Sequence, residues 1–178
     1  MDALILAFRL GLGLLLVGGG VAKYLRLRDF RHAVADYKIL PDRLISAVAW
    51  TVPALELLMG LSFLVGVTTG VAGVAAAGLF VAFGIAMSIN LFRGRSINCG
   101  CLGVAPETPI RWWLVGRNVI FAAMALGVAA VPLRPQDFGQ VVPVAVATVL
   151  MLSLVALVQA ASRALAVTRR LDLRLGRP

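Results

Sequence analysis

The chain has 178 residues, of which 61% are hydrophobic and 14% charged, and its mean hydropathy is +0.96. A soluble domain contains roughly 45–50% apolar residues, so a soluble fold is excluded because the few polar residues could not cover this much apolar surface. The net charge of +9 would suggest nucleic acid in a soluble protein, but here the basic residues lie between hydrophobic stretches, which predicts an integral membrane protein that binds no nucleic acid.

Five hydrophobic stretches have the roughly 20-residue length that crosses a bilayer. Lipid satisfies no backbone hydrogen bonds, and the stretches lack the alternation of a barrel strand, so they predict helices. We expect one all-α transmembrane domain over residues 1–178, a four-helix core plus a fifth transmembrane helix. The first stretch follows no basic segment and precedes no small-residue cleavage site, so we expect it to be retained. The expected spans are Ala3–Ala22, Leu44–Val67, Val71–Leu91, Trp112–Val131 and Val141–Ala161.

The loop after the first span predicts a short amphipathic helix near residues 26–39. Leu27, Phe30, Val34 and Tyr37 recur at helical spacing, with basic residues between them. Such a helix is expected to lie on the lipid headgroups, with His32 at the surface. The basic tail 163–178 is expected to extend the last span along anionic lipid.

The basic residues of the short loops predict the orientation of the chain. They gather in the first loop, the third loop and the tail, whereas the second turn has none and the fourth loop has only Arg134. We therefore expect a multi-pass protein of a bacterial plasma (inner) membrane, with its N-terminus outside and its C-terminus cytoplasmic. The loop residues that carry this prediction are Lys23, Arg26, Arg28, Arg31, Lys38, Arg43, Arg93, Arg95 and Arg111.

The two cysteines of the chain stand together as Cys99-Gly100-Cys101, between the third and fourth spans. A disulfide across one residue is strained, and Gly100 has the backbone freedom to permit it, so such a bond would be labile and suited to redox exchange. Two thiols and the single His32 do not complete a tetrahedral metal site, so no metal is expected. On the predicted orientation the pair lies at the cytoplasmic face.

Charged and amide side chains inside the spans are the other candidates for function. A charge near the bilayer centre costs at least roughly 2.5 kcal/mol, so Arg9, Glu56 and Arg117 are expected to face the bundle. Arg9 and Glu56 should lie at similar depths and form an ion pair, either a structural clip or a group that handles protons or quinone. Arg117 lies at the membrane end of the cysteine loop and would favour a thiolate there. Asn90 and Asn118 either extend a polar network at that end or only join helices.

Four segments of the sequence carry a family resemblance. They are Gly18–Lys23 with Phe30, Tyr37 and Leu40-Pro41, then Pro53–Leu57, then Cys99–Gly103, then Arg117-Asn118. Together they resemble the MauE family of methylamine utilisation proteins, within the broader DoxX-like membrane proteins, over roughly Ala3–Val131. Leu102 stands where these proteins often have Phe. The resemblance implies a small four-helix core acting with a thioredoxin-like partner, in a role proposed in maturation of disulfide-rich methylamine dehydrogenase. It does not imply methylamine for this chain.

We predict a membrane thiol–disulfide electron carrier, an oxidoreductase if it turns over, in which Cys99 and Cys101 exchange electrons with a thioredoxin-fold partner. A quinone is a candidate second acceptor, although no sequence feature identifies its site. Two alternatives stay open: a transporter or binding protein for a soft metal or persulfide, and a structural subunit that scaffolds a redox partner. The family's substrates lie outside the cell, whereas the loop charges place Cys99 and Cys101 at the cytoplasmic face. Three explanations stay open: the orientation is inverted, the pair relays electrons across the membrane, or the pair reaches a site at the middle of the membrane. The sequence leaves the oligomeric state open.

Overall fold

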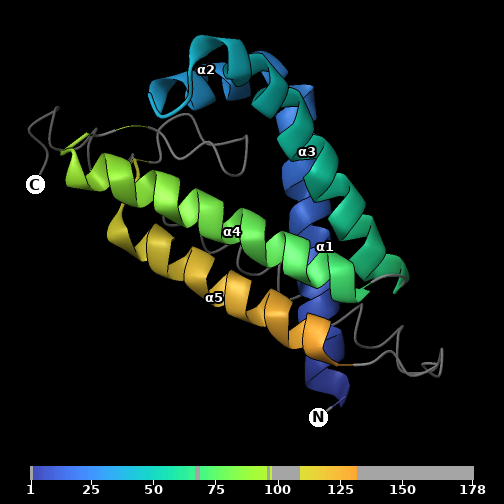
Figure 1. Cartoon of the computed structure of the whole chain (residues 1–178). Coiled ribbons are helices and arrows are strands. Elements are labelled where there is room, and N and C mark those ends of the chain that lie inside the picture. Colours follow the sequence, from blue (N-terminus) through green and yellow to red (C-terminus); the bar gives the residue numbers. More distant parts are fainter. Residues whose placement is uncertain (1, 67–68, 96, 98–108, 132–178) are drawn as a thin grey trace, which may run out of the picture. The chain divides into compact units, whose positions relative to one another are not determined.

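The computed structural model describes residues 2–66, 69–95, 97 and 109–131 of the chain. In this part of the protein the structure has five helices, and four of them are long and apolar enough to cross a membrane, which confirms the predicted all-α membrane fold (Figure 1). The helices are α1 (Asp2–Leu25), α2 (Leu27–Asp36), α3 (Asp42–Val65), α4 (Thr69–Phe92) and α5 (Trp112–Ala130). The predicted fifth span 141–161 and the basic tail 163–178 lie outside the described residues, so the single-domain organisation stays a prediction.

The antiparallel helices α1 and α3 pack closely because glycines face each other across their interface. A Cβ atom at Gly60 would lie only 2.8 Å from Val17 Cγ2 and 2.9 Å from the carbonyl oxygen of Gly13. Gly20 makes a similar approach to the carbonyl of Pro53 further along the interface. Small residues of this kind let two membrane helices come into backbone contact, since there is no hydrophobic force to draw helices together in lipid.

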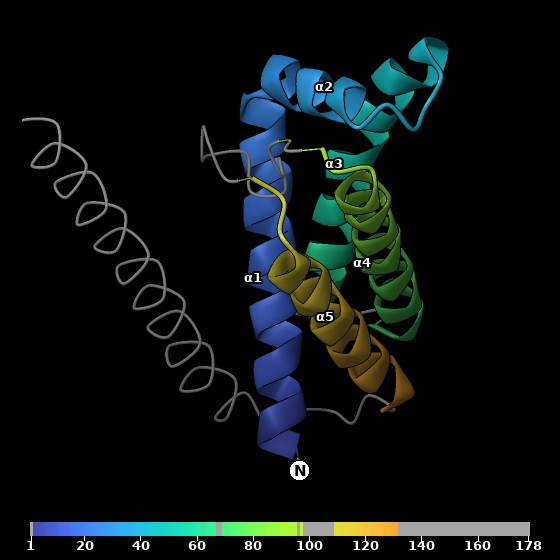
Figure 2. The same ribbon diagram turned by 90° about the vertical axis from the view of Figure 1, so that its left-hand side faces the viewer.

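Helices α4 and α5 form the second close pair, and they lie side by side in both views (Figures 1 and 2). A Cβ atom at Gly73 would lie 2.7 Å from the carbonyl oxygen of Ala125, so a larger residue would separate the helices. The two pairs share one core, in which Phe63 and Ala125 are fully buried. The other buried residues of this core are Leu12, Leu16, Met59, Ala72, Ala76, Ala77, Phe80, Ala122 and Val128.

Helix α2 crosses the end of the bundle, above the space where α3 and α4 diverge from their common turn (Figure 1). It is amphipathic, as predicted, but its apolar side is turned to protein. Phe30 is buried and packs with Ala49 and Val52 of α3, and Val34 packs beside it. The prediction of a helix whose apolar side simply rests on headgroups is therefore corrected: α2 covers the bundle.

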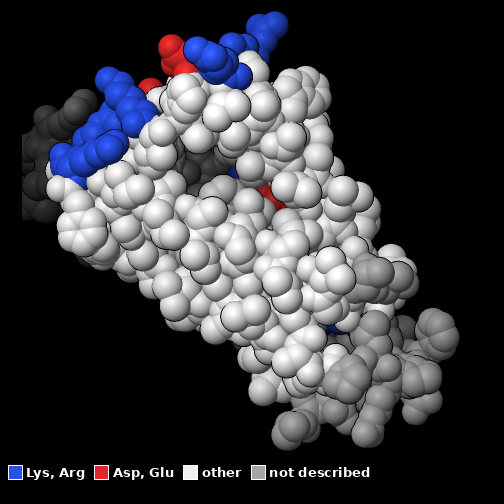
Figure 3. Space-filling model, in the orientation of Figure 1, with Lys and Arg blue, Asp and Glu red and all other residues white. Residues whose placement is uncertain are grey.

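Charge and aromatic side chains both gather at the α2 end. The exposed basic residues of the described loops lie there, in agreement with the predicted loop charges (Figure 3). All three tryptophans and both tyrosines lie in the same half of the bundle. Two aromatic contacts join helices there: Tyr24 with Trp50, at 5.9 Å between ring centroids, and Phe92 with Trp112, at 4.9 Å. The orientation of this end relative to the cell stays a prediction.

Candidate functional site

Cys99 and Cys101 lie outside the described residues, but the structure describes both ends of the segment that contains them. The backbone N–H of Ile110 donates a hydrogen bond to the carbonyl of Ile97, at 2.9 Å. Ile110 is buried in a cluster with Met87 and Leu114, against which Ile97 and Tyr37 pack. The segment that carries the thiols therefore leaves and re-enters the bundle at adjacent points, at the α2 end.

Arg93 and Arg95, which precede this segment, are tied to the connection between α2 and α3. Arg95 Nη1 donates to Asn90 Oδ1 at 3.1 Å and to the carbonyl of Tyr37 at 3.4 Å, and Arg93 Nη1 donates to the carbonyl of Lys38 at 3.4 Å. Asn90 is fully buried. It therefore helps to anchor the start of the cysteine segment, in the region where the sequence predicted a polar role.

Arg117 and Asn118 are adjacent in α5 but have different surroundings. The Arg117 guanidinium lies 5.5 Å from the ring centroid of Trp113 and 5.8 Å from that of Phe121. Its Nε is buried and has no hydrogen-bond partner in the described part of the chain. Asn118 donates to the carbonyl of Leu114 at 2.7 Å, within its own helix. The described residues thus contain no hydrogen bond that joins Asn118 to Asn90, and the role of the two amides at the cysteine end stays a prediction.

A buried ion pair joins Lys23 of α1 and Glu56 of α3. Lys23 Nζ lies 2.8 Å from both carboxylate oxygens of Glu56, and the two side chains are 1% and 5% exposed. The prediction that Lys23 is a loop residue was wrong, because α1 continues to Leu25 and takes Lys23 into its last turn. One signal in the sequence could have found it: the buried stripe through Leu12 and Leu16 reaches Lys23 after seven more residues, which is two helical turns.

The predicted pair between Arg9 and Glu56 is also wrong. Arg9 is buried beside Gly66, where a Cβ atom would lie 2.9 Å from Arg9 Nη1. Gly66 follows Glu56 by ten residues, which is about 15 Å along a helix. The facing glycines set the register of α1 against α3, and the long Lys23 side chain reaches Glu56 from the last turn of α1, whereas Arg9 reaches Gly66. Arg9 instead lies at the C-terminal end of α3, where the helix dipole favours a cation.

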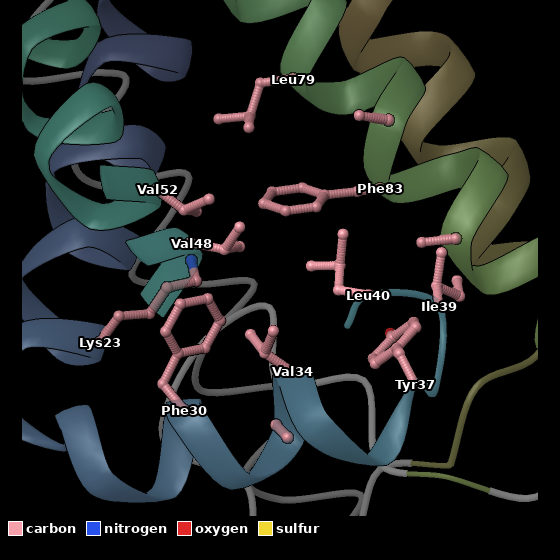
Figure 4. Close-up of a pocket in the computed structure, with 13 residues that line it drawn as sticks. Lys23, Phe30, Val34, Tyr37, Ile39, Leu40, Val48, Val52, Leu79 and Phe83 are labelled. Atoms are coloured by element: carbon pink, nitrogen blue, oxygen red, sulfur yellow. The ribbon is translucent and has the colours of Figure 1, made fainter. Parts of the chain in front are cut away.

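A cavity of about 280 Å³ lies beneath α2, between α3 and α4, and Lys23 of α1 reaches it (Figure 4). Figure 4 shows Phe83 entering from α4 opposite Val48 and Val52, with Lys23 and Phe30 at one end and Tyr37 at the other. The Lys23 ammonium lies 5.6 Å from the centroid of Phe30 and 5.9 Å from that of Phe83. The remaining lining residues are apolar: Ala33, Val34, Ile39, Leu40, Leu79, Ala82 and Ala86. Sequence reasoning missed this site, since its walls come from four separate elements.

Metal ligands do not cluster in the part of the chain that the structure describes. There, no group of three or more His, Cys, Asp and Glu side chains could hold a metal ion. Glu56, the buried acidic residue of the described spans, is instead paired with Lys23. For residues 98–108, which include both thiols, the expectation that no metal binds stays a prediction.

Comparison with known proteins gives one family. The family model "Methylamine utilisation protein MauE" matches residues 1–133. The chain is 36% identical over 124 residues to the methylamine utilization protein MauE of Paracoccus denitrificans, covering 69% of this chain and 67% of that protein. It is 35% identical over 145 residues to the protein of the same name from Methylophilus methylotrophus, covering 80% and 76%. No solved structure gives a significant match.

Proposed function

The chain belongs to the MauE family, and from that premise we propose that it is a membrane thiol–disulfide redox protein. Its working group is the pair Cys99 and Cys101, and its partner is a thioredoxin-fold protein. The observation that carries the proposal is that both cysteines of the chain fall in one short segment, whose ends are hydrogen-bonded together at Ile97 and Ile110. Cys99 is only two residues along the chain from Ile97, so this anchor supports a thiol pair held at the membrane boundary.

The chemistry is a two-electron exchange. When the pair is oxidised, the two thiols lose two electrons and two protons and form one S–S bond, while the S–S bond of the partner breaks and becomes two thiols. The exchange passes through a mixed disulfide, in which one thiolate attacks a sulfur of the partner and the second thiol resolves the adduct. The reverse direction uses the same steps.

The thiolate that attacks needs a positive environment. Arg93, Arg95 and Arg111 flank the segment on both sides. Arg117 begins the second turn of α5, with its guanidinium held against two aromatic rings and its Nε without a described partner. We assign to Arg117 the role of stabilising the thiolate. We also propose that the family belongs to the DoxX-like membrane proteins. The chain would lie in a bacterial inner membrane, with its N-terminus outside and its C-terminus in the cytoplasm.

Trapping of the mixed disulfide tests this function. In cells that contain the natural partner, Cys99→Ser or Cys101→Ser should accumulate an adduct with a thioredoxin-fold protein on a non-reducing gel. The variant that lacks both cysteines is the matched control and should show none. The purified protein should also form an intramolecular disulfide with a potential above about −270 mV, the thioredoxin value.

The result that would refute the redox proposal is also defined. Two alkylatable thiols that never pair in any glutathione buffer, together with normal partner function in the variant lacking both cysteines, would leave a scaffolding role. Stoichiometric binding of a soft metal ion by thiols that do not pair would support the metal-binding alternative.

A further inference from the structure

The cavity beneath α2 connects the lipid-facing surface with the ion pair of the bundle. Its inner end is formed by Lys23 and Phe30, which are 1% and 8% exposed. At its outer end Ile39 is 39% exposed, and Ala82 of α4 is also exposed. Figure 3 shows a recess on this face, below the exposed basic side chains. A molecule dissolved in the bilayer can therefore enter from the side, without crossing the charged end of the bundle.

The electrostatics of the cavity favour a neutral molecule that carries acceptor oxygens. Lys23 lines the cavity and Glu56 does not, so the wall presents the positive member of the pair. The pair as a whole is neutral, and a ligand with its own net charge would enter an apolar site without a counter-charge, which is costly. A carbonyl oxygen that faces the ammonium meets both conditions. A hydrocarbon chain would pack against the apolar lining but would offer no acceptor to the ammonium of Lys23.

The aromatic side chains favour a ring. Phe30 of α2 and Phe83 of α4 both lie within 6 Å of the Lys23 ammonium, measured from their ring centroids. A flat ring placed beside the ammonium would therefore have aromatic partners from two helices, and such pairs are favoured at centroid separations of about 4.5–7 Å. The volume of about 280 Å³ is near the lower limit for small-molecule sites, which is roughly 300 Å³, so it suits a ring with its tail left outside.

We propose that this cavity binds the ring of an isoprenoid quinone, with a ring carbonyl facing Lys23 and the tail leaving past Ala82 into lipid. Glu56 acts as a positioning residue, because it holds the Lys23 ammonium at the cavity wall. Tyr37 links this site to the cysteine segment: it lines the cavity, and it packs in the cluster that anchors Ile97 and Ile110.

A role for the quinone as electron acceptor rests on the proposed function. In that role the two thiols of Cys99 and Cys101 lose two electrons and two protons and form one disulfide. The quinone takes up the same two electrons and two protons and becomes the quinol. A thioredoxin-fold protein then reduces the disulfide again, so the chain carries electrons from that partner to the quinone pool.

Binding is tested with decyl-ubiquinone as the probe, added to the purified full chain in detergent, with affinity read from quenching of tryptophan fluorescence. The variant Ala82→Phe fills the cavity mouth and should weaken binding by about tenfold or more, because its ring occupies the space through which the quinone tail would leave. Ala75→Phe is the matched control, since Ala75 is exposed on the same side of α4, seven residues away, and lines no part of the cavity. It should bind as the unaltered chain does.

Other outcomes overturn the proposal. Equal binding by Ala82→Phe would mean that the quinone does not bind in this cavity, and quenching of the same strength by oleate or phosphatidylcholine would mean an acyl-chain site. Glu56→Gln should weaken decyl-ubiquinone binding because it releases the Lys23 ammonium from its position. Phe83→Leu should weaken binding because it removes the aromatic partner of the quinone ring. Unchanged binding in both variants would exclude this cavity as the site. Decyl-ubiquinone binding without oxidation of the thiols would retain the site and contradict the redox function. Thiol oxidation by glutathione disulfide without quinone binding would support the redox function and refute the quinone site.

Discussion

Removal of one partner of the ion pair between Lys23 and Glu56 should destabilise the protein more than removal of both. At 2.8 Å and an effective dielectric constant of about 20, the attraction between the two charges is about 6 kcal/mol. The desolvation of two side chains that are only 1% and 5% exposed offsets most of this gain. A single variant keeps the desolvation cost of the remaining charge and loses the attraction.

The expected magnitudes follow from this balance. Glu56→Leu and Lys23→Met should each lower the free energy of unfolding by about 3–5 kcal/mol. The double variant Lys23→Met with Glu56→Leu should lose far less than the sum, and replacement of a buried pair by apolar side chains of similar volume is often neutral. The coupling energy is the difference between the loss in the double variant and the sum of the losses in the two single variants, and the contact between Lys23 and Glu56 predicts that it is large.

The assay is thermal unfolding of purified variants in detergent, followed by circular dichroism of the helices. The cycle of Arg9→Gln with Glu56→Gln is the matched control, because Arg9 lies beside Gly66 and about 15 Å from the level of Glu56. Its losses should add. Additive losses for Lys23 with Glu56, or strong coupling for Arg9 with Glu56, would refute the register of α1 against α3.

Two further predictions concern packing and orientation. Gly60→Leu should lower the unfolding midpoint by separating α1 from α3, whereas Gly78→Leu should not, since a Cβ atom at Gly78 meets nothing within 4 Å; equal losses in the same assay would argue against glycine-mediated contact. In a chain that lacks the native cysteines, Gly70→Cys should react with a membrane-impermeant maleimide added outside intact cells, and Arg28→Cys should react only after the cytoplasm is opened. The opposite labelling would invert the orientation.

The four spans in the described part of the chain were predictable from the sequence because hydropathy alone decides which stretches can enter lipid. The start of α5 at Trp112 agrees with the prediction, and α3 and α4 each begin two residues before their predicted first residues. The end of α1 was not predictable on the same grounds. A lysine normally marks the end of a span, and only a partner on another helix makes its burial tolerable.

The site was predicted less well, because it depends on which residues of different helices meet. Glu56 was expected to have a buried cationic partner, and it has one, but the register that selects Lys23 over Arg9 comes from the contact of Gly13 with Gly60. The cavity needs Phe30 of α2 and Phe83 of α4 within 6 Å of the Lys23 ammonium, and no spacing within one segment indicates such a meeting. The redox role of Cys99 and Cys101 stays a prediction.

The one-sided distribution of tryptophan and tyrosine has a consequence for how the protein responds to bilayer thickness. These residues prefer the headgroup level, and all five of them lie in the half of the bundle that carries α2. They hold that half at a constant depth, whereas the described residues of the opposite end include no tryptophan or tyrosine to meet its interface. In a thinner or thicker membrane the mismatch is therefore taken up at the far end. The depth of the cavity mouth and of the anchored ends of the cysteine segment then stays the same in every membrane that the protein occupies.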